Sequence, residues 1–110
     1  MAGCAEDLAP EHRAAYEVYV EAACECTKIL GEIPTEVDAS GVESVDIEQA
    51  KEVARKARGC QADAAHRHTE AVKQHSYSQG LTEEAHVELD AFEKAVGRCL
   101  EDVNHYLRLR

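Results

Sequence analysis

Apolar residues recur along the first third of the chain at alternating spacings of three and four, which is the pattern of an amphipathic helix. This pattern predicts a first helix over residues 9–31. Pro10 fits its first turn, where the N–H that proline lacks would have no partner anyway. Gly31 and Pro34 are typical of its end. The face expected to be buried carries Ala15, Tyr19, Ala22, Cys26 and Ile29.

Two further helical patterns follow, over residues 46–76 and 81–108. Ser44 or Asp46 is the expected N-cap of the second helix, and Thr82 that of the third, since their side-chain oxygens can accept from unpaired N–H groups. The buried stripe of the second helix is expected to be Ala50, Ala54, Ala57, Ala64 and Ala71. That of the third is expected to be Ala85, Leu89, Phe92, Val96, Cys99, Val103 and Tyr106.

Together these patterns predict an all-α fold, an antiparallel three-helix bundle whose second and third helices are long. At 110 residues the chain is long enough for a single domain. Residues 1–8 are expected to form a loose N-terminal arm, and residues 32–45 an acidic connection without strand-like alternation. With one Phe and no Trp the core is thin, so a second copy of the chain is expected to complete it as a homodimer.

The net charge of the chain limits the classes of partner that it can bind. Lys and Arg number 12 against 22 Asp and Glu, which gives a net charge of −10. This charge argues against direct binding to nucleic acid or to an anionic membrane surface, and no apolar run is long enough for a membrane span. It favours a protein partner with a basic surface. We expect a cytoplasmic location.

The chain has five cysteines, an unusually high count for its length. Cys24 and Cys26 lie two residues apart, so on a helix they are rotated by about 200° and cannot bond to each other or share a metal ion. We expect Cys26, Cys60 and Cys99 to be free thiols in the core. The alternative is a Cys60–Cys99 disulfide, which would indicate an oxidising compartment.

Histidines suggest a second kind of site. Aligning the three predicted helices places five of the six His at one end. Two of them, His66 and His86, have an acid three residues earlier, a spacing found in the metal sites of helical bundles. The predicted ligands of a Zn or Fe ion are His12, His66, His68, Glu70, His75, Glu83 and His86. The alternatives are ordinary surface histidines and a pH-sensitive cluster.

Two functions therefore follow from the sequence. The first is a small acidic interaction or regulatory protein that binds a protein partner. The second is a helical protein with a His/carboxylate metal site. We prefer the first, because no nucleophile motif or phosphate-binding loop is present in the sequence.

Overall fold

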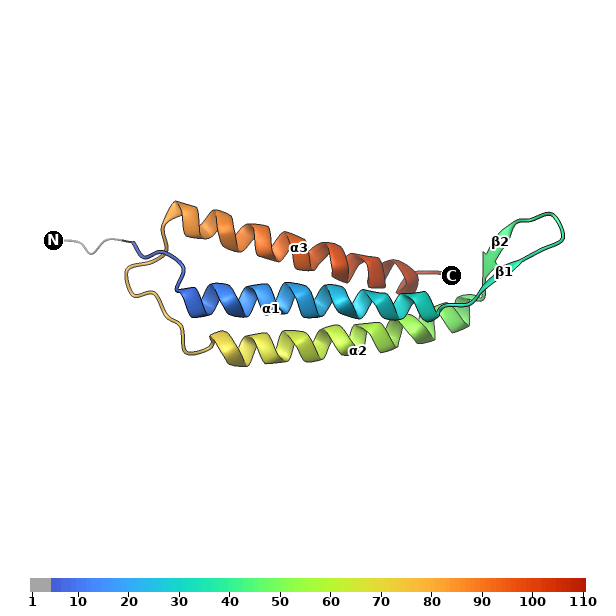
Figure 1. Cartoon of the computed structure of the whole chain (residues 1–110), viewed down its shortest axis with the longest axis horizontal. Helices are drawn as coiled ribbons and strands as arrows, with labels where there is room; N and C mark the ends of the chain where they lie inside the picture. The colour runs from blue at the N-terminus through green and yellow to red at the C-terminus, as the bar shows by residue number, and fades with distance from the viewer. Residues whose placement is uncertain (1–4) are drawn as a thin grey trace.

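The computed structural model describes residues 5–110, over which the chain is mostly helical (Figure 1). In chain order the elements are α1 (Pro10–Cys26), the 3₁₀ helix η1 (Thr27–Glu32), β1 (Thr35–Val37), β2 (Glu43–Val45), α2 (Ile47–Val72) and α3 (Glu83–Leu107). The prediction of a helical fold with three α-helices is confirmed for this part of the chain.

The helices lie side by side along a rod of 74 × 23 × 21 Å, and each of them contacts the other two. α1 and α3 run in one direction and α2 in the other, so the α2–α3 connection and the N-terminal segment share one end (Figure 1). The β1–β2 hairpin projects from the opposite end. The α2–α3 connection therefore marks one end of the rod and the hairpin marks the other. Among the helices of residues 5–110, none combines the length and the apolar character needed to cross a membrane.

Of the two candidates for the N-cap of α2, Ser44 and Asp46, the structure has Asp46, and the predicted cap of α3, Thr82, is confirmed. Asp46 accepts a hydrogen bond from the N–H of Gln49 at 3.0 Å, and Thr82 accepts one from the N–H of Ala85 at 3.1 Å. α1 begins without a side-chain cap, with Pro10 in its first turn. Each cap satisfies an N–H that the first turn of a helix leaves unpaired, which fixes where α2 and α3 begin.

Small side chains dominate the core. Ala23, Ala54, Ala57 and Val103 are fully buried, and Ala54, Ala57 and Val103 pack together near the hairpin end. Alanine on facing helices lets their backbones approach closely, but each alanine removes little apolar area from water. The core is therefore closely packed but buries little apolar area, so interactions other than apolar packing must help to hold the helices together.

Two parts of the chain differ from the sequence-based expectation. The connection expected to lack strands contains an antiparallel hairpin in which Thr35 faces Val45 and Val37 faces Glu43. The overlooked signal was a turn-forming run, residues 38–41, which ends in Gly41 at a φ of 80° and lies between two valine-containing segments.

The other difference concerns the N-terminal arm. Glu6 exchanges backbone hydrogen bonds with the α2–α3 connection, donating to Gly80 and accepting from Thr82, each at 2.9 Å. Thr82 also donates its hydroxyl to Asp7, and Leu8 is 3% exposed. Residues 6–8 are therefore docked on the fold, and the expectation of a loose arm is wrong for them. Their partners lie more than 70 residues away in the sequence, so no local pattern could indicate the contact. The rest of the expected arm, residues 1–4, lies outside the described residues.

Candidate functional site

Histidine and aromatic rings gather where α1 meets the end of α2. His12 stacks on His75 with ring centres 5.1 Å apart, and His68 stacks on Tyr19 at 4.6 Å. Tyr16 links the two pairs, since its ring lies 5.3 Å from His12 and 4.2 Å from His68. We call this set the ring cluster; its members are His12, Tyr16, Tyr19, His68, His75, Tyr77 and Phe92.

Tyr77 contacts both His12 and the backbone at the start of α1. Its hydroxyl oxygen accepts the backbone N–H of Ala9 at 3.1 Å and lies 2.8 Å from Nδ1 of His12. A hydroxyl has one proton to donate, and Nδ1 of a neutral imidazole can accept it. The hydroxyl oxygen can also accept from a protonated Nδ1 through its second lone pair, so the contact forms with either tautomer of His12.

Burial makes the charged forms of His12 and His68 unfavourable. It lowers the pKa of His12, and the neighbouring His75 and His68 lower it further. Burial also lowers the pKa of His68, with a smaller opposing effect from the backbone carbonyl of Ala15. The pKa of Tyr16 is raised by burial and then by Glu93 and Tyr19. Cations are disfavoured inside the ring cluster because the rings exclude water there.

The predicted metal ligands are only partly brought together. His12, His68 and His75 belong to the ring cluster, but His66, Glu70, Glu83 and His86 have exposed side chains. Glu70 forms an ion pair with Lys73 at 2.6 Å. Over residues 5–110 there is no group of three or more His, Cys, Asp or Glu residues positioned to hold a metal ion. The Zn or Fe site stays a prediction.

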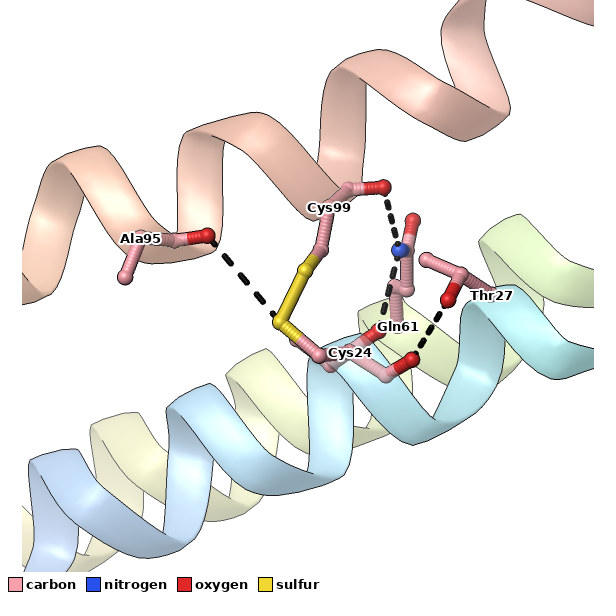
Figure 2. The surroundings of a disulfide bond; sticks show 6 residues. Cys24, Thr27, Gln61, Ala95 and Cys99 are labelled. Atoms are coloured by element: carbon pink, nitrogen blue, oxygen red, sulfur yellow. Dashed lines mark hydrogen bonds between the residues drawn. A yellow bond between two sulfur atoms is a disulfide. The ribbon is translucent and has the colours of Figure 1, made fainter.

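The prediction for the cysteines is wrong, both as free thiols and as a Cys60–Cys99 pair. Cys24 is bonded to Cys99 on α3 (Figure 2), and Cys26 is bonded to Cys60 on α2. Because Cys24 and Cys26 point to different sides of α1, one turn of this helix is tied to both of its neighbours. The register between the helices explains the error. Counting from the predicted connection between the first two helices places Cys26 level with residue 53, but it is bonded to residue 60, two helical turns away.

Gln61 lies beside the disulfides and was not singled out from the sequence. It is 2% exposed, and its Nε2 donates to the carbonyl oxygens of Ala23 at 3.1 Å and of Cys99 at 3.0 Å (Figure 2). One amide on α2 thus joins α1 and α3. Its Oε1 is buried and has no hydrogen-bond partner among residues 5–110. A glutamine within a stripe of alanines was the sequence signal for this role.

A shallow apolar cavity of about 280 Å³ lies between α1 and α2 next to the ring cluster. It is lined by the alanines of both helices together with Val18 and Tyr19, and Arg67 and His68 also contribute to it. Val18 is 66% exposed. The cavity exists because alanines leave the space between the two helices unfilled.

Most of the exposed apolar side chains lie at the opposite end of the rod. Six large hydrophobic residues are notably exposed within residues 5–110, and four of them belong to the hairpin or follow it directly. These four are Val37, Val42, Val45 and Ile47. Every residue of β1 and β2 is exposed. We call residues 35–47 the hairpin surface.

Acidic groups accompany these valines. The hairpin surface contains Glu36, Asp38, Glu43 and Asp46 and no Lys or Arg. Two of the carboxylates stabilise the local backbone, because Asp38 accepts from the N–H groups of Ser40 and Val42 and Asp46 caps α2. Glu36 and Glu43 lie on the strands. The hairpin surface is therefore both apolar and negatively charged.

Comparison with known proteins gives no match to a family model, to a curated protein or to a solved structure. The function is therefore argued from the residues themselves.

Proposed function

We propose that this chain is a small acidic interaction protein that binds a protein partner through the hairpin surface. The observation that carries the proposal is the concentration of exposed apolar side chains there: Val37 is 62% and Val42 58% exposed. Apolar side chains kept in water and grouped on a projecting element are typical of a contact surface.

Charge supports a basic partner. The four carboxylates of the hairpin surface have no Lys or Arg within the same residues to neutralise them. A positively charged surface would be attracted before contact, which raises the association rate and selects against acidic competitors. The helices would then act as a rigid scaffold for the hairpin surface, because the disulfides and Gln61 fix the spacing between them.

Two properties of the whole molecule belong to this proposal. We propose that the helices form an antiparallel bundle in solution and that a second copy packs on the cavity between α1 and α2, where Val18 is exposed. We also propose an oxidising compartment in place of the cytoplasmic location expected from the sequence. The support for this change is the pair of disulfides, since such bonds are rare in reducing compartments.

A peptide-display selection against the oxidised full-length chain tests the hairpin surface. Peptides that bind are measured against a triple variant, Val37→Ser, Val42→Ser and Val45→Ser. The matched control is Val87→Ser, which removes an exposed apolar side chain outside both the hairpin and the cavity. We expect the triple variant to weaken binding by about tenfold or more, and the control to change it by less than about twofold.

The proposal fails if no selected peptide binds the chain. It also fails if the triple variant binds the selected peptides as well as the unmodified chain does. Circular dichroism of each variant confirms that the helices are retained. Sedimentation of the unmodified chain separates monomer from dimer.

A further inference from the structure

The backbone of the hairpin leaves one strand edge available for pairing. The N–H of Asp38 donates to the carbonyl of Val42 at 3.1 Å, and the strands continue from there in an antiparallel register. Hydrogen-bonded and non-bonded pairs alternate in such a register. Glu36 and Ser44 are therefore a bonded pair, and the N–H and C=O groups of Thr35 and Val37 point away from β2.

The side chains along this edge alternate in character. Thr35 and Val37 lie on one face of the hairpin together with their cross-strand partners Val45 and Glu43, and Glu36 lies on the other face opposite Ser44. The β1 edge thus presents two β-branched side chains on one face and a carboxylate on the other. Within residues 5–110 the sheet consists of β1 and β2 alone, so no third strand from this chain covers the edge.

We propose that the β1 edge binds an extended segment of the partner as a third strand, in which apolar and basic side chains alternate. This inference rests on the proposed function and specifies how the hairpin surface is used. Apolar side chains of the segment would pack on the face of Thr35 and Val37, and its basic side chains would lie beside Glu36. Main-chain hydrogen bonds provide affinity in this mode of binding, and the alternating side chains provide specificity.

Two observations favour this occupant and this edge. A second copy of the chain would place Glu36 beside another acidic strand, and like charges on adjacent strands destabilise the pairing. In β2 the residue between Glu43 and Val45 is Ser44, which has no carboxylate and occupies the position that Glu36 has in β1. β2 is also followed almost directly by α2. The β1 edge therefore fits a basic partner better than the β2 edge does.

The contact would be short, because β1 supplies only Thr35 and Val37 as residues with outward backbone groups. Charge attraction must then provide a large part of the affinity. Binding should weaken as salt is added, because the carboxylate of Glu36 is exposed and salt screens exposed charges.

Fluorescence polarisation with the oxidised full-length chain tests this inference. The probe is a short labelled peptide of alternating valine and lysine, and the comparison peptide alternates valine and glutamate. Val37→Pro removes one outward N–H and keeps an apolar side chain. Val45→Pro is the matched control, because it removes an outward N–H from the β2 edge and, unlike Val45→Ser, keeps an apolar side chain in the hairpin surface. Amide exchange of Asp38 reports whether each variant retains the hairpin.

We expect the valine–lysine peptide to bind and the valine–glutamate peptide not to bind. Val37→Pro should raise the Kd by about tenfold or more, and Val45→Pro should change it by less than about twofold. Glu36→Lys should reverse the preference between the two peptides. If Val37→Pro loosens the hairpin, Thr35→Pro repeats the test at the neighbouring outward N–H.

Two results would overturn strand addition but leave the proposed function standing. In the first, Val37→Pro binds the peptide as well as the unmodified chain does, whereas the triple serine variant binds it weakly. In the second, the valine–lysine peptide does not bind, although display-selected peptides do. If the triple serine variant also leaves the binding of every selected peptide unchanged, both proposals fail together.

Discussion

The hydroxyl of Tyr77 lies 2.8 Å from Nδ1 of His12, a contact between the α2–α3 connection and the first turn of α1. The same hydroxyl accepts the N–H of Ala9, so one side chain contacts both the start of α1 and its buried histidine. His12 is 9% exposed and stacks on His75, which leaves little room for water around a positive charge. This arrangement makes the end of the rod sensitive to protonation.

Acidification is expected to destabilise the protein through His12. Its pKa is lowered in the folded state, chiefly by burial, so below about pH 6.5 the unfolded chain binds more protons than the folded one. The contribution of His12 to the free energy of unfolding is fully present above that pH. It is lost as the pH falls toward the lowered pKa. Urea unfolding at a series of pH values measures this loss.

The matched control for this prediction is an exposed histidine at the other end of the rod. His12→Gln should reduce the dependence of the unfolding free energy on pH between about 7 and 5, and His105→Gln is measured in parallel as the exposed reference. A pH dependence that is the same in His12→Gln and in the unmodified chain would contradict the assignment.

Removing the Tyr77 hydroxyl should destabilise the fold. Tyr77→Phe keeps the ring but leaves the Ala9 N–H and the His12 Nδ1 without their partner, which we expect to cost about 1–2 kcal/mol. Tyr19→Phe is the control, because the Tyr19 hydroxyl makes no hydrogen bond within residues 5–110. Chemical denaturation at neutral pH measures both variants. Equal stabilities for Tyr77→Phe and Tyr19→Phe would show that the hydroxyl contributes nothing.

The disulfides are expected to provide a large share of the stability. The Cys24–Cys99 and Cys26–Cys60 bonds have sequence separations of 75 and 34 residues. Closing loops of these sizes restricts the unfolded chain, and each bond should contribute roughly 4 kcal/mol. Replacing either pair with alanine, followed by thermal unfolding, should lower the Tm markedly. Cys4→Ser is the control, since it leaves both bonded pairs intact.

Peptide mapping checks the pairing itself. Glu25 separates Cys24 from Cys26, so cleavage after glutamate combined with trypsin places the two cysteines on different fragments. The non-reduced digest should contain a fragment with Cys24 joined to Cys99 and another with Cys26 joined to Cys60. A Cys60–Cys99 fragment would contradict the structure.

Zinc titration separates the interaction hypothesis from the metal hypothesis. We expect the purified chain to hold less than one Zn per molecule, because His66, Glu70, Glu83 and His86 lie on exposed surfaces instead of converging with the ring cluster. Calorimetry and elemental analysis measure the uptake. Stoichiometric uptake that disappears in the His68→Ala, His86→Ala double variant, with helicity retained, would favour the metal site instead.

Local patterns were sufficient for the helices and for their first turns. Apolar spacing identified the face that carries Ala54, Ala57 and Val103, all of which are fully buried. Asp46 and Thr82 were identified as caps because capping depends on residues within one turn. The hairpin was missed because its strands are only three residues long and fully exposed, so they have no buried face to produce an alternating pattern.

The sequence by itself determined the helical class, the caps and the acidic charge, since each depends on neighbouring residues or on composition. The tertiary structure decided the disulfide partners, the docking of Glu6 on the α2–α3 connection, and the membership of the ring cluster. These features depend on the register between helices. An error of two turns in aligning α1 with α2 changes every residue that faces Cys26, and no local pattern fixes that alignment.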